Sequence, residues 1–384
     1  MMDQPCADCG HPRDMHCVQE GMCIDCECPG WRRAELMKVA LIATVKDEEA
    51  DIWPFLQSIE QQTRRPWMTV ITVSRKSKNT AMLVRRFRKR TKLKRFRWYW
   101  TDLNRSGGRN LATLIAADLG AEAIACTNVC VLDPDWLNKI VTPIETGEAD
   151  FVGGFWNIET KNTGEHAMAL LTQWTSPEQV KSPAALSMAF TVNAWANIGG
   201  FPPELDTSED TEFVRRLRDD LYMEAFVPDA IVNWRPGTLT VEGAVNIYYQ
   251  FAKTDAKASL RTDQYAGTYL AYLLSALGMV MFFPLGAFML AGWLLFRVRK
   301  VVSAGLVDQV PLALFAAVGI DIARMTGFAL EKLRRLRRRY MPPSRAELEH
   351  IIELWQDHGS LESEDCDVCR ALEFYRVTGT WVEP

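Results

Sequence analysis

The sequence lacks an excess of charge of either sign. Its 384 residues carry 44 Lys and Arg against 48 Asp and Glu, which gives a formal net charge of −4. Nucleic-acid binding through bulk positive charge is therefore not expected. The first residues also lack a basic stretch followed by an apolar run, so a secretory signal is not predicted. Hydrophobic residues at 48% and charged residues at 24% exclude a disordered or collagen-like chain.

Cysteine is scarce outside the two ends of the chain. Six of the ten cysteines lie within the first 28 residues, and a C-x-x-C pair lies near the other end. Two C-x-x-C pairs place four thiolates within reach of one another, which predicts a structural Zn²⁺ site in a head formed by residues 1–31. The predicted ligands are Cys6, Cys9, Cys23 and Cys26, with His16 and Cys28 as alternates. A disulfide framework is the alternative. The head resembles a short Cys/His module found in some actinobacterial and bacteriophage proteins.

Short apolar runs alternate with helical patterns between residues 38 and 237. The runs at 38–45, 68–74, 95–100, 122–127 and 150–156 predict strands. Apolar residues at three- and four-residue spacing predict helices at 49–61, 80–92, 107–119 and 134–146. This alternation predicts an α/β fold with a mostly parallel sheet between helices. Ligands of such sheets bind at the carboxyl ends of the strands.

A long uncharged stretch follows the α/β region. Residues 268–296 carry no charged side chain over 29 positions, whereas about 20 apolar residues suffice to cross a bilayer. One tilted span is compatible with this length, and Pro284 near the middle also allows a helical hairpin that enters one leaflet. A buried core helix is the third interpretation. Arg297, Arg299 and Lys300 follow at once, which favours a cytoplasmic location for that end and for the α/β domain.

The region after this stretch mixes apolar and charged residues. Residues 310–336 contain Asp321 and Arg324 on one helix face and lead into a run of five arginines and one leucine at 334–339. An interfacial or second membrane helix that binds anionic lipid is expected here. The sequence thus predicts four parts, namely the head at 1–31, the α/β domain at 38–255, membrane-associated helices at 264–340 and an acidic tail at 344–384. Cys366 and Cys369 in the tail are either half of a second metal site or a surface pair.

An ordered series of motifs spans more than half of the chain. They are TVKDEEADIWPFLQSIEQQT (44–63), GGRNLATLIAADLGAEAIACT (107–127), LDPDWL (132–137), SMAFTVNAWANIGGFPPEL (187–205), SEDTEFVRRLR (208–218) and WRPGTL (234–239). In this order they resemble the family 2 glycosyltransferases, which are inverting enzymes with a glycosyltransferase-A fold. YYQFAKTDAKA (248–258) is similar to membrane-bound members, which continue into a hydrophobic hairpin.

The resemblance implies a role for each matching position. Asp210 corresponds to the general base that deprotonates the acceptor hydroxyl, and Glu209 beside it orients or binds the acceptor. The alternative is that both residues only favour the start of a helix through its dipole. The nucleotide-sugar donor is expected at Glu48, Ser74, Arg109, Thr127, Asn128 and Asp133, and the hydroxyl-bearing acceptor at Trp234 and Arg235.

The sequence departs from the family at its metal motif. An Asp-x-Asp pair that holds Mn²⁺ or Mg²⁺ precedes the LDPDWL-like segment in the family, whereas this chain has Thr127, Asn128 and Val129 there. Neutral oxygens are weak ligands for a hard cation, so transfer independent of a divalent metal is one expectation. The alternative is that Mn²⁺ or Mg²⁺ is held by Asp133 and Asp135 nearby, although Asp135 also lies where a helix start normally has a capping acid. Arg75, Lys76 and Lys78 offer positive charge for the phosphates instead.

Two functional hypotheses follow from these motifs. The first is a membrane-associated glycosyltransferase that moves a sugar from an activated donor to a hydroxyl acceptor of protein, lipid or glycan. The second is a catalytically silent descendant that binds or scaffolds a partner at the membrane. Nucleic-acid binding by the head and the basic patches is disfavoured, because the head is acidic and lacks the spacing of a ββα finger.

Overall fold

The computed structural model describes residues 37–340, and from Val39 onward the described chain belongs to one compact unit. Its centre is a sheet of eight strands in the order β3-β2-β1-β4-β7-β6-β8-β5. The strands are β1 (Val39–Val45), β2 (Met68–Ser74), β3 (Phe96–Thr101), β4 (Ala123–Thr127), β5 (Val131–Leu132), β6 (Phe151–Ile158), β7 (Ser187–Thr191) and β8 (Glu224–Trp234).

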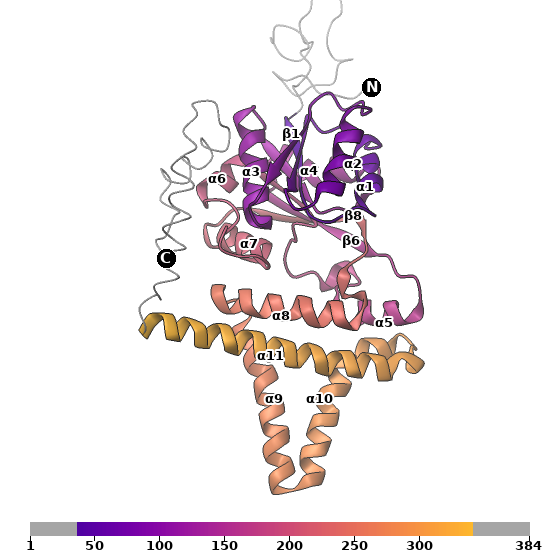
Figure 1. Ribbon diagram of the computed structural model, residues 1–384, viewed down its shortest axis with the longest axis vertical. Coiled ribbons are helices and arrows are strands. Elements are labelled where there is room, and N and C mark those ends of the chain that lie inside the picture. The colour runs from indigo at the N-terminus through magenta and orange to yellow at the C-terminus, as the bar shows by residue number, and fades with distance from the viewer. Residues whose placement is uncertain (1–36, 341–384) are drawn as a thin grey trace, which may run out of the picture. The chain divides into compact units, whose positions relative to one another are not determined.

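Helices flank this sheet and continue beyond it (Figure 1). Those of the α/β part are α1 (Ile52–Glu60), α2 (Lys78–Arg88), α3 (Arg105–Asp118), α4 (Trp136–Glu145), α5 (Thr163–Thr172), α6 (Val192–Asn197) and α7 (Glu209–Asp219). They are followed by α8 (Val241–Ala258), α9 (Thr262–Met281), α10 (Phe283–Ser303) and α11 (Val310–Tyr340). The five strands predicted from short apolar runs and the four helices predicted from apolar spacing are confirmed, within four residues at their ends.

The expectation of a mostly parallel sheet is only partly correct. Strands β1 to β4 pair in parallel, but β7 runs antiparallel to both β4 and β6, and β5 runs antiparallel to β8. The α/β fold is therefore mixed. Apolar runs such as 150–156 are buried in either orientation, so their composition does not encode strand direction.

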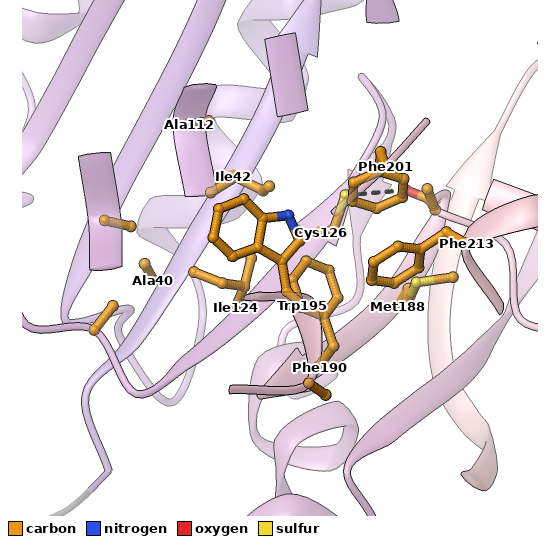
Figure 2. Packing of buried hydrophobic residues seen from close by; sticks show 14 of the residues in the cluster. Ala40, Ile42, Ala112, Ile124, Cys126, Met188, Phe190, Trp195, Phe201 and Phe213 are labelled. Atoms are coloured by element: carbon orange, nitrogen blue, oxygen red, sulfur yellow. Dashed lines mark hydrogen bonds between the residues drawn. The ribbon is translucent and has the colours of Figure 1, made fainter. Parts of the chain in front are cut away.

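The main core lies where the two halves of the sheet meet. Phe190 on β7, Phe201 and Phe213 pack their rings together, with centroid distances of 4.1–5.9 Å. Figure 2 shows these rings beside Met188 and Cys126. Phe213 belongs to α7 and Phe201 to the loop before it. Burying such rings contributes roughly 2–3 kcal/mol each, so the core fixes α7 against the carboxyl end of β4.

The uncharged stretch forms an antiparallel helical hairpin. Helix α9 ends at Phe282 and α10 begins at once with Pro284 in its first turn, so the single span across 268–296 is wrong. Gly278 and Gly286 let the two helices touch, because a Cβ on Gly286 would lie 2.1 Å from the backbone nitrogen of Met279. Pro284 suits a first helical turn, where no backbone N–H bond is lost.

Helix α11 lies along α8 at the base of the hairpin (Figure 1). Buried alanines of α11 contact its neighbours, as Ala316 packs with Ala244 of α8, whereas Ala313 and Ala317 pack with Val298 and Val301 of α10. Within the described residues, one helical stretch, Val307–Leu336, has the length and apolar composition to cross a membrane, with a mean hydropathy of 1.5.

Candidate active site

Polar residues gather at the carboxyl ends of β1, β2 and β4. The turn after β1 carries Glu48, β2 ends at Ser74, and β4 ends at Thr127 with Asn128 next. Neighbouring parallel strands end at the same edge, so segments separated by dozens of residues are brought side by side. The predicted donor-binding residues therefore share one edge of the sheet.

Helix α3 carries Arg109 to this edge through a close contact with β1 and β2. Thr44 and Thr72 bond each other at 3.0 Å, and the Thr72 hydroxyl donates to the carbonyl of Gly108 at 3.2 Å. A Cβ on Gly108 would lie 2.5 Å from Cγ2 of Thr44. Glycine is required at this position because any side chain would push the helix, and Arg109 with it, off the sheet.

Arg109 joins two of the predicted motifs inside the protein. Its guanidinium is 1% exposed, forms an ion pair with Glu209 and donates from Nη2 to Asn128 Oδ1 at 2.8 Å. It also lies over the ring of Phe201, 5.5 Å from the centroid. Because the guanidinium is enclosed and paired, its effect on a donor would act through Asn128 and Glu209. The direct contact of Arg109 with the donor phosphate stays a prediction.

The loop before α7 is fastened to α3 by side-chain amides. Asn110 donates to the carbonyl of Phe201 at 2.7 Å and accepts from its backbone nitrogen at 2.9 Å. Asn104, which caps α3, donates to the carbonyl of Pro203 at 2.7 Å. Gly200, which directly precedes Phe201, has φ +73°, in the left-handed region that favours glycine. The Gly-Gly-Phe turn thus fixes where α7 begins.

Asp210 lies in the first turn of α7, next to the buried Arg109–Glu209 pair. Its carboxylate is half-buried and accepts from the backbone nitrogens of Thr211 at 2.8 Å and Ala185 at 3.2 Å. These two backbone donors fix the orientation of the carboxylate. The residues Glu209, Asp210 and Glu212 all lie in this turn, so the helix-dipole interpretation and the functional one apply to the same carboxylates.

Glu48 has an altered protonation equilibrium. Burial, together with the nearby carboxylate of Asp51, raises the pKa of Glu48 to about 7. Its backbone nitrogen donates to Oγ1 of Thr80 at 3.2 Å, which holds the turn after β1 against α2. A carboxyl group that is partly protonated at neutral pH can donate a hydrogen bond as well as accept one.

The residues in place of the metal motif do not fit a divalent cation. The buried Thr127 hydroxyl donates to the carbonyl of Leu186 at 2.9 Å, the Asn128 oxygen is taken by Arg109, and Val129 is apolar and buried. Burial raises the pKa of the Cys130 thiol to about 12, so it is not a thiolate ligand at neutral pH. Among residues 37–340, no three His, Cys, Asp or Glu side chains group as metal ligands.

Polar partners are also present for the predicted site residues Asp133, Ser74 and Arg235. Asp133 accepts from Asn233 at 3.0 Å, and Ser74 accepts weakly from the backbone of Lys76 at 3.4 Å. Arg235 follows Trp234 at the end of β8 and forms an ion pair with Glu165 on α5 at 2.5 Å. Arg75 is paired with Asp102 at 2.8 Å. The predicted zinc ligands Cys6, Cys9, Cys23 and Cys26, with His16 and Cys28, lie outside the described residues.

A buried network that the sequence reasoning missed connects α7 to the hairpin. Asp255 on α8 is 1% exposed and accepts from Ser208 at 2.9 Å, Arg261 at 2.7 Å and Tyr265 at 2.8 Å. Arg261 also donates to Thr211, beside Asp210, at 2.9 Å. The signal available in the sequence was an acidic residue inside an otherwise amphipathic helix, which is costly unless it is paired.

Comparisons with known proteins give structural similarity alone. No protein-family model matches the sequence, and no curated protein matches it. The chain is similar to the mannosyltransferase PcManGT from Pyrobaculum calidifontis in complex with GDP-Man and Mn²⁺, with 15% identity, a TM-score of 0.48, and coverage of 78% of this chain and 88% of that one. It is also similar to residues 1–349 of TarS from S. aureus in complex with UDP-GlcNAc, with 14% identity, a TM-score of 0.40, and coverage of 76% and 91%.

Proposed function

We propose that this protein is an inverting glycosyltransferase that transfers a sugar from a nucleotide-activated donor to a hydroxyl acceptor. One observation carries the proposal. Three motifs that lie far apart in the chain converge through direct bonds at the carboxyl edge of the sheet, as Arg109 links Asn128 to Glu209. The carboxylate of Asp210 lies beside them, held by two backbone donors. A merely structural acidic turn does not require the buried arginine that ties it to the end of β4.

In this mechanism Asp210 accepts the proton of the acceptor hydroxyl as that oxygen attacks the anomeric carbon. Glu209 keeps its position through Arg109, and Arg109 in turn orients the Asn128 amide toward the donor side. The diphosphate leaves with its negative charge near polar groups at the ends of β1 and β2, namely Glu48, Ser74 and the basic residues after β2. No step is assigned to a divalent cation, because residues 127–129 do not fit one.

The test is the release of nucleoside diphosphate from a panel of UDP-, GDP- and dTDP-sugars by the full chain, with and without EDTA. We expect release from at least one donor, and we expect EDTA to leave the rate within about twofold, since the residues at 127–129 do not fit a divalent cation. Absence of release across the panel, together with absence of a thermal shift by UDP, GDP or dTDP, would support the silent scaffold instead. Activity that EDTA abolishes would refute metal independence.

We also propose that the protein works at a membrane surface, with the α/β part on the cytoplasmic side. The tip of the hairpin presents large apolar side chains to solvent, with exposed fractions of 86% for Val280 and Met281 and 68% for Phe283. The apolar part of α9 rises roughly 20 Å, which suits one leaflet rather than a full bilayer. Arg297, Arg299 and Lys300 lie toward the other end of α10, where lipid headgroups would be.

Helix α11 is best explained as an interfacial helix. Its exposed apolar residues Phe315, Ile322 and Leu333 fall on one face at helical spacing, away from the buried alanines that pack with α8 and α10. If α11 spanned the bilayer, the charged helix α8 would enter with it, at high cost. The alternative is that the same surface joins two copies of the chain.

Flotation with vesicles of anionic phospholipid tests the membrane proposal. We expect the wild type to float and the Met281→Asp/Phe282→Asp variant to stay with the soluble fraction. Leu221→Asp is the matched control, because Leu221 is 88% exposed but lies after α7. A tip variant that floats like the wild type would refute the assignment, as would a stable dimer that does not bind vesicles.

A further inference from the structure

One edge of the sheet carries a concentration of positive charge, and the site described above uses only the part of it that directly follows β2. Residues 75–101 contain twelve Lys and Arg and no Asp or Glu, although the chain as a whole is slightly acidic. This segment comprises α2 and β3, and β3 is the outermost strand at its end of the sheet. A charge imbalance of this size disfavours folding through mutual repulsion, so a bound anion is a physical reason for it.

Within this segment, α2 and β3 border a cavity that is open to solvent. Its volume is about 360 Å³, and it is lined by Arg85, Arg88, Lys89 and Trp98. The three cations are spaced at i, i+3 and i+4, so they extend from one face of the helix end. Trp98 is half-buried on β3 and forms the apolar wall. The volume is at the small end of the range for ligand sites, which suits an occupant of one or two rings.

The cations of this cavity are not neutralised by the protein. Within residues 37–340, no ion pair involves Arg85, Arg88 or Lys89. Glu60, the acid that does approach the end of α2, is occupied by the Thr91 hydroxyl at 2.5 Å and the Lys92 backbone at 2.7 Å. Three exposed cations around an aromatic wall present donors for phosphate or carboxylate and a flat apolar surface for a ring.

We propose that this cavity binds an anionic glycan, a saccharide chain that carries phosphate or carboxylate groups, and that it holds the acceptor of the proposed transferase. The apolar face of a sugar ring packs on Trp98, while its anionic groups meet Arg85, Arg88 and Lys89. The inference deepens the proposed function, because it names the acceptor class. The cavity lies toward the end of α2, whereas the start of α2 lies at the edge that carries Glu48, so a polymeric acceptor would extend between the two.

The arrangement of the aromatic rings favours a glycan over single-stranded nucleic acid. Proteins that bind single strands offer successive rings on which successive bases stack. Here Trp100 stands edge-on to Trp98, at an interplanar angle of 72° and a centroid distance of 5.3 Å. The two indoles therefore do not form consecutive platforms, and the cavity itself is lined by one ring.

Calorimetric titration of the full chain with chemically matched polymers tests the proposal. The probes are unmodified dextran, carboxymethyl dextran, phosphorylated dextran and oligo(dT), all at the same ionic strength. We expect both anionic dextrans to bind and neutral dextran not to bind. Trp98→Ala and Arg88→Glu should each weaken binding by about fivefold or more. Arg335→Glu, an equal charge reversal on α11, should leave binding unchanged.

Each other outcome overturns the proposal. If oligo(dT) binds more tightly than the anionic dextrans, the site is a nucleic-acid site. If Arg335→Glu weakens binding as much as Arg88→Glu, the attraction is one of net charge alone. If Trp98→Ala binds like the wild type while its circular dichroism is unchanged, the cavity is not the site. The titration uses no donor and no turnover, so it is independent of whether Asp210 catalyses transfer.

Discussion

Removing the charge of Glu209 should unfold this protein far more readily than removing a surface carboxylate. Glu209 and Arg109 are 2% and 1% exposed, and the other bond of the Arg109 guanidinium is to the neutral amide of Asn128. Glu209→Gln keeps the shape but removes the directly paired counter-charge of the guanidinium in a site that excludes water. Breaking a buried pair from one side costs about 3–5 kcal/mol.

The same helix provides a matched control. Arg218 and Glu224 form an ion pair at 2.6 Å, but their side chains are 43% and 28% exposed. Glu224→Gln should therefore cost less than about 1 kcal/mol. The free energy of unfolding is measured by urea denaturation, followed by tryptophan fluorescence, at pH 7.

A double variant separates the pair from its surroundings. Arg109→Met/Glu209→Met removes both charges and fills the site with apolar side chains. Its free energy of unfolding should therefore fall by less than that of the Glu209→Gln single variant. Equal losses for Glu209→Gln and Glu224→Gln would refute the reasoning, because they would mean that water reaches Arg109.

Three further predictions follow from particular side chains. Glu48 has a pKa of about 7 in the folded protein and 4.5 as a free side chain. The free energy of unfolding should therefore fall as the pH rises from 4.5 to above 7, by at most about 3 kcal/mol. In Glu48→Gln, urea denaturation at pH 5 and pH 8 should show a smaller fall in the free energy of unfolding. Asp255→Asn should lower the melting temperature and release the hairpin connection, seen as faster amide hydrogen exchange at 259–265, because Arg261 loses its ion pair. Gly286→Ala should separate α9 from α10 and destabilise the hairpin, whereas Gly292→Ala, where a Cβ meets nothing within 4 Å, should leave the melting temperature within about 1 °C.

The sequence predicted the elements of the α/β part better than their arrangement. Runs such as 38–45 and 68–74 are mostly apolar and become the buried strands β1 and β2. The direction of β7 and the position of β5 at the far edge of the sheet depend on pairing between distant segments. Hydrophobic periodicity and composition do not specify such pairing. The hairpin was one of several open alternatives, and Pro284 is where the chain reverses.

The candidate site shows the same limit at the level of side chains. Glu209, Asp210, Arg109 and Asn128 were recognised as separate motifs, and they do meet. Their separate roles were not predictable, because they depend on burial. Arg109 is enclosed and pairs with Glu209, so we infer that it positions other residues. Asp135 lies at the N-cap position of α4, but its carboxylate accepts from the Thr63 hydroxyl at 2.6 Å and does not cap the helix. The partners of Asp255 come from three segments that only the fold brings together.

The central claim is that the Asp210 carboxylate removes the proton of an acceptor hydroxyl. The most direct test compares Asp210→Asn with Asp220→Asn, an exposed position just after the same helix, in steady-state turnover and in donor binding. The account predicts that Asp210→Asn lowers kcat by about 100-fold or more with the donor Kd within about twofold, and that Asp220→Asn changes neither. An Asp210→Asn enzyme that turns over at the wild-type rate would contradict it.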